Sequence, residues 1–91
     1  MTDTQMLGLL EEVTEKLSVK LEYDDLRKGV VNTPGGTYLL HGEKHILVHK
    51  RLPTAEKVDL IATLLSAMDL ETVELLPEIR KRIMASSASK S

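Results

Sequence analysis

The chain has 91 residues, a net charge of −2 and no cysteine, and its only aromatic residues are Tyr23 and Tyr38. These values predict a single domain with an aliphatic core, and they exclude disulfides, thiolate metal sites and cysteine nucleophiles. No apolar run approaches the roughly 20 residues that span a bilayer, and the start of the chain lacks a signal-peptide pattern, so we expect a cytoplasmic protein with no membrane partner.

The first elements predicted along the chain are a helix over residues 2–17 and a half-buried strand over Val19–Tyr23. Apolar residues recur at helical spacing in the first segment, where Thr2 and Gln5 fit a capping box. In the second segment apolar and polar residues alternate, which is typical of a strand with one covered face. Gly29–Val31 is a candidate for a short further strand.

A β-hairpin is predicted from Thr37–Leu40 and His45–Lys50. Gly42 suits the first position of a two-residue type II′ turn, and in that register Leu40 pairs with His45. Neither face of the hairpin is cleanly polar, so we expect the hairpin to lie centrally in the sheet or to be covered on both sides.

Thr54–Met68 is the element around which the other segments are expected to pack. In a helix, its apolar side chains cover roughly twice the ~100° arc that a surface helix needs, so this helix should be covered from more than one side. Thr54 is its expected N-cap. A short last helix begins at Pro77, a residue that suits the first helical position, and ends near Met84.

The order of these elements predicts an α+β fold. It has an N-terminal helix, a mainly antiparallel sheet of three or four strands that includes the hairpin, a central helix and a short C-terminal helix. Residues 1–84 form this single domain, and residues 85–91 are expected to be a disordered tail. The predicted core consists of Leu10, Val13, Leu21, Leu39, Ile46, Val48, Val58, Ile61, Leu65 and Ile79.

The histidines His41, His45 and His49 are the one set of residues that suggests a metal site. On a helix this spacing of four would place them on one face, but Gly42 and the β-forming residues around it favour a strand. In a strand, residues four apart lie about 13 Å from each other, too far to share an ion that binds nitrogen at about 2.0 to 2.1 Å. We therefore predict no metal site. We also predict no cofactor and no catalytic residue.

The basic segment over residues 44–57 is the strongest surface candidate for an anion-binding site. Its cations are Lys44, Lys50, Arg51 and Lys57. Such a cluster attracts phosphate groups, but the segment lacks the interleaved aromatic residues of single-strand binders, so we do not expect nucleic acid as the natural partner.

Most of the chain, from Leu17 to Ile83, resembles a family of short, uncharacterised bacterial proteins. The shared pattern comprises a Gly pair, a hairpin with a Gly turn, a Leu-Pro start to the central helix and a closing Pro-x-x-Arg. In this chain these features are Gly35-Gly36, Gly42, Leu52-Pro53 and Pro77-Glu78-Ile79-Arg80. The resemblance implies a shared fold and carries no information on activity.

The order of elements is also similar to the start of the ImmA/IrrE-type zinc metallopeptidase domain, whose helix carries His-Glu-x-x-His. Thr63 and Ala67 stand where the two histidine ligands of that motif would be, and Leu64 replaces the catalytic glutamate. This resemblance therefore implies the scaffold without the metal and without the general base.

Three hypotheses on function remain. The favoured one is a non-catalytic protein-interaction module with an unknown protein partner, because no catalytic set converges in the sequence. The alternative is a degenerate metallopeptidase-like or metal-binding protein, which would use the histidines. A third hypothesis is anion or RNA binding through the basic segment over residues 44–57.

Self-association is a further expectation. Leu60, Leu64 and Met68 lie on one flank of the central helix and would form an exposed apolar strip if nothing covers them. Such strips mark interfaces, and a two-fold homodimer is the commonest way to bury one. In the competing account the last helix folds back over this flank and the chain stays a monomer.

Overall fold

The computed structural model of the chain describes residues 2–25 and 35–88. Its order of elements is the α+β arrangement expected from the sequence, and the candidate strand at Gly29–Val31 lies outside the described residues. The elements are α1 (Asp3–Lys16), β1 (Lys20–Asp24), β2 (Gly35–Leu40), β3 (Glu43–His49), α2 (Thr54–Ser66) and α3 (Pro77–Ala88).

In the described part of the chain the sheet has three strands in the order β1-β3-β2, so β3 is central and the other two of these strands form the edges. It is a mixed sheet, because β1 runs parallel to β3 while β2 runs antiparallel to it. Leu21 lies beside Ile46 in the parallel pair. Side chains alternate between faces in the same way in parallel and antiparallel strands. The sequence pattern therefore did not show that β1 is parallel to β3, and we had expected a mainly antiparallel sheet.

A two-residue turn at His41-Gly42 joins β2 to β3, one position earlier than we expected. Both residues have positive φ, 51° at His41 and 81° at Gly42, which is the requirement of a type I′ turn. Leu40 therefore pairs with Glu43, and Tyr38 pairs with His45. The expected register was wrong by two residues, a shift that leaves each side chain on its expected face of the sheet.

Both ends of α1 are capped. Thr2 and Gln5 form the predicted capping box, in which each side chain accepts a hydrogen bond from the backbone N–H of the other residue. At the other end Ser18 has a φ of 59°, and the N–H groups of Ser18 and Val19 donate to carbonyls of the last helical turn. This is the Schellman arrangement, which usually has glycine at the left-handed position.

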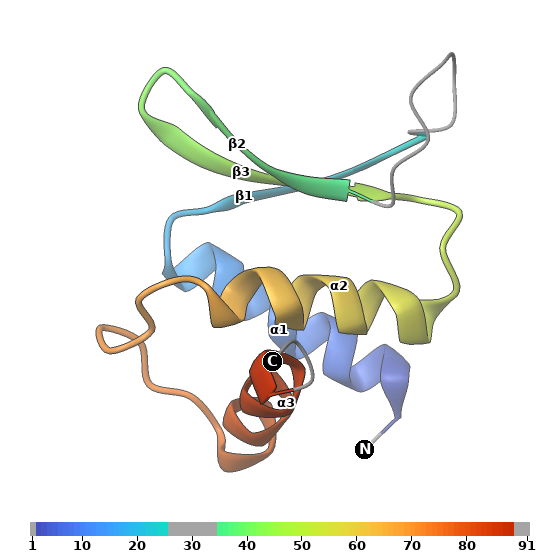
Figure 1. Cartoon of the computed structure of the whole chain (residues 1–91), viewed down its shortest axis with the longest axis vertical. Coiled ribbons are helices and arrows are strands. Elements are labelled where there is room, and N and C mark those ends of the chain that lie inside the picture. The colour runs from blue at the N-terminus through green and yellow to red at the C-terminus, as the bar shows by residue number, and fades with distance from the viewer. Residues whose placement is uncertain (1, 26–34, 89–91) are drawn as a thin grey trace.

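The molecule has a layered arrangement in which α1 and α2 cover one face of the sheet and α3 packs against these two helices, away from the sheet (Figure 1). Helix α2 contacts the sheet and both other helices, as expected for the central element. No described helix covers the other face of the sheet. The buried apolar residues are Leu10, Val13, Val19, Ile46, Val48, Val58, Ile61, Ala62, Leu65, Val73, Leu75, Ile79 and Ile83.

Two members of the predicted core behave differently. Leu21 is half-buried against the core, whereas Leu39 is 70% exposed and was wrongly assigned to it. Leu39 points to the helix side of the sheet, but it belongs to an edge strand. Helix α2 lies close beneath the start of this strand, where a Cβ placed on Gly35 would be 3.1 Å from Cδ2 of Leu60.

Two helix boundaries also differ from the expected ones. Pro53, rather than Thr54, occupies the N-cap position of α2 and provides no side-chain cap. Helix α3 continues beyond Met84 to Ala88, and Ser86 is buried. The expectation of a disordered tail is therefore wrong for residues 85–88, because this small-residue segment extends the helix.

Candidate functional site

The four basic residues of the predicted anion site do not form one patch. Lys44 lies near the hairpin end of β3, whereas Lys50 and Arg51 follow the other end of this strand. At about 3.3 Å per residue, the strand separates the two groups by roughly 20 Å. Arg51 lies 3.6 Å from the carboxylate of Asp25, and the Lys57 ammonium lies 5.3 Å from the centre of a tyrosine ring. Two of the four cations therefore have partners within the fold.

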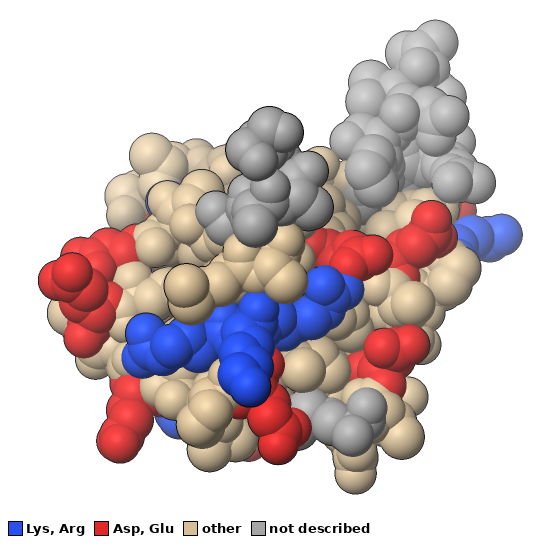
Figure 2. All heavy atoms as spheres, turned by 60° about the horizontal axis from the view of Figure 1, so that its bottom comes forward, with Lys and Arg blue, Asp and Glu red and all other residues tan. Residues whose placement is uncertain are grey.

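A different basic surface lies on the side of the molecule where α3 is found. Figure 2 shows a band of Lys and Arg side chains on this face, bordered by acidic side chains. Helix α3 contains three consecutive basic residues, of which Arg80 and Lys81 are exposed. The third, Arg82, forms an ion pair with Asp59 of α2. The mixed charge of this face makes it a weak anion site.

The residues of the predicted interface are partly covered. Leu60, Leu64 and Met68 pack against the core and do not form an exposed strip. The start of β2 lies over Leu60, as the close approach of Gly35 shows. Among the described residues, the large apolar side chains that are exposed are others: Tyr38, Leu39 and Leu40 on β2, Leu76 before α3, and Met84 on α3.

The three histidines are not brought together. His41 is exposed in the hairpin turn, and His45 and His49 are buried on the same face of β3. Their positions on the strand place these last two about 13 Å apart along it. In residues 2–25 and 35–88, no group of three or more histidine, aspartate or glutamate side chains is placed to hold a metal ion.

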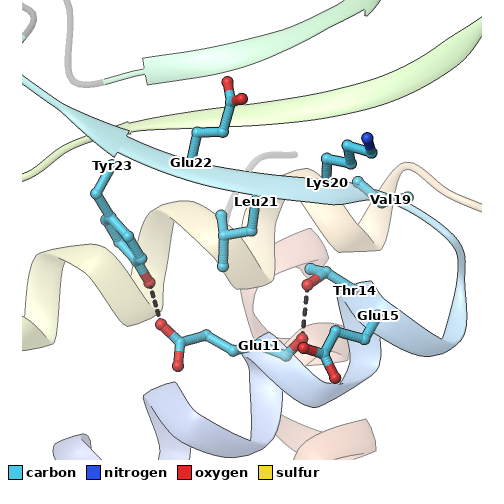
Figure 3. Close-up of a pocket in the computed structure, with 8 residues that line it drawn as sticks. All are labelled: Glu11, Thr14, Glu15, Val19, Lys20, Leu21, Glu22 and Tyr23. Carbon is cyan, nitrogen blue, oxygen red and sulfur yellow. Dashed lines mark hydrogen bonds between the residues drawn. The ribbon is translucent and has the colours of Figure 1, made fainter.

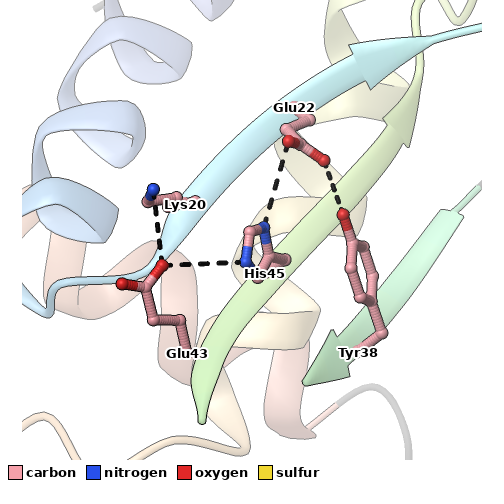
Figure 4. A network of polar contacts seen from close by, with 5 residues as sticks. All are labelled: Lys20, Glu22, Tyr38, Glu43 and His45. Atoms are coloured by element: carbon pink, nitrogen blue, oxygen red, sulfur yellow. Dashed lines mark hydrogen bonds and ion pairs between the residues drawn. The ribbon is translucent and has the colours of Figure 1, made fainter. Parts of the chain in front are cut away.

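His45 lies at the centre of a polar network on the face of the sheet that no described helix covers (Figure 4). This residue is buried, and its ring stacks on the ring of Tyr38, with the ring centres 4.8 Å apart. Nδ1 lies 3.9 Å from an oxygen of Glu22, and Nε2 lies 3.9 Å from an oxygen of Glu43. These distances are too long for hydrogen bonds, and neither ring nitrogen has a hydrogen-bond partner among the described residues.

The rest of this network joins β2 to β1 and β1 to β3. The Tyr38 hydroxyl donates a 2.6 Å hydrogen bond to Glu22 of β1, and Lys20 lies 3.3 Å from the carboxylate of Glu43. The hydrogen bond to Glu22, with smaller effects of burial and of the Glu22 charge, raises the pKa of Tyr38 above its ordinary value. The phenol therefore stays protonated and keeps donating to Glu22 through the neutral range.

A groove of about 490 Å³ separates α1 from the edge strand β1 (Figure 3). Across it the Tyr23 hydroxyl donates a 2.5 Å hydrogen bond to the carboxylate of Glu11, and within α1 the Thr14 hydroxyl donates a 2.6 Å bond to the Glu11 carbonyl. Burial, followed by the hydrogen bond and charge of Glu11, raises the pKa of Tyr23 well above its usual range. The hydrogen bond from Tyr23 to Glu11 therefore links β1 to α1.

Among the described residues, no strand pairs with the outer edge of β2, and some backbone hydrogen-bonding groups of this strand point toward that edge. The residues that flank a two-residue hairpin turn form a hydrogen-bonded pair, and bonded and non-bonded pairs then alternate along the ladder. The bonds to β3 therefore come from Leu40, Tyr38 and Gly36. The N–H and C=O groups of Thr37 and Leu39 point away from β3, toward the outside of the sheet.

The side chains on this edge are apolar as well. Tyr38, Leu39 and Leu40 are exposed, and Gly35–Leu40 contains neither a charged residue nor a proline. Charges and prolines are the usual means of preventing an edge strand from pairing with another chain. The opposite edge, β1, has the sequence KLEYD and is charged at alternate positions. The outer edge of β2 is therefore our candidate functional site.

Comparisons with known proteins identify no relative: the sequence matches no protein family, no curated protein and no solved structure. The similarity to ImmA/IrrE-type domains stays a prediction. Thr63 and Leu64 lie in α2 and Ala67 is its C-cap. In the described part of the chain, no helix is both long enough and apolar enough to cross a membrane.

Proposed function

We propose that this protein is a non-catalytic protein-interaction module and that its binding element is the outer edge of β2. The observation that carries the proposal is the coincidence, on one edge strand, of outward-pointing backbone groups at Thr37 and Leu39 with the exposed side chain of Leu39. An extended segment of a partner adds to such an edge through main-chain hydrogen bonds, and its side chains supply the specificity.

Both faces of the added strand would meet apolar side chains. Side chains of a strand alternate between faces, so the partner would contact Leu39 on the helix side and Tyr38 and Leu40 on the open side. Tyr38 is already held in place by its stacking on His45 and its hydrogen bond to Glu22. A preorganised contact of this kind lowers the entropic cost of binding.

The other two hypotheses have less support. A metal-binding function would need several ligands placed together, whereas His45 and His49 lie about 13 Å apart along β3 and the described residues contain no group of three or more ligands. An anion site would need cations that act together, whereas Lys44 is remote from Lys50 and Arg51. The metal-binding hypothesis would gain support if metal analysis shows a bound ion. The anion-binding hypothesis would gain support if a binding titration at low salt shows an interaction.

The experiment is a selection of displayed random peptides on the immobilised protein, followed by affinity measurements on two matched variants. Leu39→Lys introduces a charge on the candidate edge, and Leu76→Lys introduces the same charge at another exposed leucine, which is 56% exposed. We expect selected peptides to lose at least about tenfold in affinity for the first variant, equivalent to roughly 1.4 kcal/mol, and to retain affinity for the second.

A backbone test complements the side-chain test. Thr37→Pro removes an N–H that points outward without removing a bond to β3, which is the position where an edge strand tolerates proline. Peptides that add as a strand should bind this variant more weakly. Equal affinity for the wild type, Leu39→Lys and Thr37→Pro would refute the proposal.

A further inference from the structure

The outer edge of β2 is also complementary to itself, an inference that rests on the proposed function. We propose that the partner is a second copy of this chain and that the two β2 strands pair in antiparallel orientation about a two-fold axis. The two three-stranded sheets would then form one continuous sheet. A two-fold interface uses the same surface on both copies, so a single strand must supply both halves of the contact.

The open backbone groups limit the register of this pairing. They come from alternate residues, so a ladder forms only when outward-pointing residues lie opposite each other. With the axis at Leu39, the Leu39 residues of the two copies exchange both of their hydrogen bonds. Tyr38 of each copy then lies opposite Leu40 of the other. All three exposed apolar side chains of the strand meet apolar neighbours in this register.

An axis at Tyr38 is the nearest alternative, and it fits less well. It would place Leu39 opposite Thr37 and Leu40 opposite Gly36. The two leucines would then face a hydroxyl-bearing side chain and a residue with no side chain. Cross-strand pairs contribute most when large apolar side chains face each other, so the axis at Leu39 is preferred.

Charge does not oppose self-pairing at β2. No charged residue occurs in Gly35–Leu40, so a two-fold axis brings no like charges together within the strand. Like charges directly opposite each other destabilise a strand pair.

Leu39 lies on the helix side of the sheet. It pairs with Lys44, which is two residues before the buried Ile46 and lies on the same face of β3. The two facing Leu39 side chains would therefore meet on that side of the joined sheet.

Sedimentation of the full chain over a range of concentrations tests the inference. We expect the wild type and Leu76→Lys to form dimers and Leu39→Lys to be monomeric, because self-pairing would place two ammonium groups opposite each other. Leu39 is 70% exposed, so this variant should keep the fold of the single chain, which its circular dichroism spectrum would verify. A wild type that stays monomeric at the highest attainable concentration overturns the inference, as does a Leu39→Lys variant that remains dimeric.

Single-cysteine variants test the position of the axis, and the absence of natural cysteine makes any disulfide unambiguous. A hydrogen-bonded pair has its Cα atoms about 5.5 Å apart, which is within the range for a disulfide. Leu39→Cys should therefore form a covalent dimer under mild oxidation faster than Tyr38→Cys or Leu76→Cys. Equal rates for Leu39→Cys and Leu76→Cys would overturn self-pairing at β2, and faster linkage of Tyr38→Cys would overturn the axis at Leu39.

The two proposals fail separately. A monomeric wild type that binds selected peptides through Leu39 overturns the self-pairing and supports the interaction module. A monomeric wild type for which no peptide affinity depends on Leu39 overturns both.

Discussion

Replacement of Leu65 by alanine tests the central position of α2 most directly. Leu65 is 0% exposed and belongs to the cluster that joins the sheet to the helices. Burial of a leucine side chain contributes about 1.5 to 3 kcal/mol, and the cavity left by truncation adds to the loss. Helix α2 is held between the sheet on one side and α3 on the other, so the site collapses poorly. We expect a loss of about 3 to 5 kcal/mol.

A loss of this size is a large part of the total stability. At about 0.05 to 0.15 kcal/mol per residue, a chain of 91 residues has a free energy of unfolding of about 5 to 14 kcal/mol. Urea denaturation followed by far-ultraviolet circular dichroism would measure the change. The urea midpoint should fall by at least about 1 M, with an unchanged slope of about 1 to 3 kcal/mol per M.

Leu76→Ala is the matched control for this experiment. Leu76 is 56% exposed, so its truncation should change the free energy of unfolding by no more than about 0.5 kcal/mol. Similar losses for Leu65→Ala and Leu76→Ala, or a loss below about 1 kcal/mol at Leu65, would refute the placement of α2 in the core.

Three further predictions concern single residues. Ser18→Gly should raise the free energy of unfolding by about 0.5 to 1 kcal/mol, because it removes the steric cost of a φ of 59° at the end of α1; a lower melting temperature would contradict this. His41→Asn should also stabilise the protein, since it creates the Asn-Gly pair preferred in type I′ turns, and a destabilised variant in urea would speak against that turn. Tyr23→Phe should cost about 1.5 kcal/mol at neutral pH through the lost hydrogen bond to Glu11. The raised pKa of Tyr23 stabilises the fold below about pH 10 and ceases to do so as the pH rises further, so the difference from wild type should shrink in alkaline urea titrations. A constant difference would show that Tyr23 titrates normally.

Local structure was largely predictable because its causes are local. The helical spacing of apolar residues and the Thr2–Gln5 capping box identified α1, and both features occur in the structure. Pro77 marked the start of α3 in the same way. Alternation identified β1 and the hairpin strands. Each of these signals acts within a few residues, so the sequence contains it directly.

The turn of the hairpin was harder to place. Gly42 permits a positive φ at the second position of a turn at His41-Gly42 and at the first position of a turn at Gly42-Glu43. The structure has the first turn, which requires His41 to adopt a φ of 51° as well. Residues other than glycine adopt this conformation infrequently, and for that reason the sequence favoured the other turn.

The candidate site could not be predicted from periodicity, because it depends on the order of strands. Leu39 lies on the same face as Ile46 and Val48, and for that reason it was assigned to the core. Its exposure follows from the position of β2 at an edge, with α2 beneath only the start of the strand. Leu60 was assigned to an exposed interface for the same reason, because the sequence did not show that β2 covers this residue. That a dimer forms stays a prediction.

The order in which the sheet assembles follows from its mixed topology. The hairpin joins neighbours in sequence through a two-residue turn, and such hairpins form in about 1 to 10 μs. The parallel pair joins Lys20 to His45, so its formation must close a much longer stretch of chain, at a larger entropic cost. We expect the hairpin to form first and β1 to dock afterwards together with α1. Until β1 docks, both edges of the hairpin are open, so the folding intermediate is more prone to aggregation than the native protein.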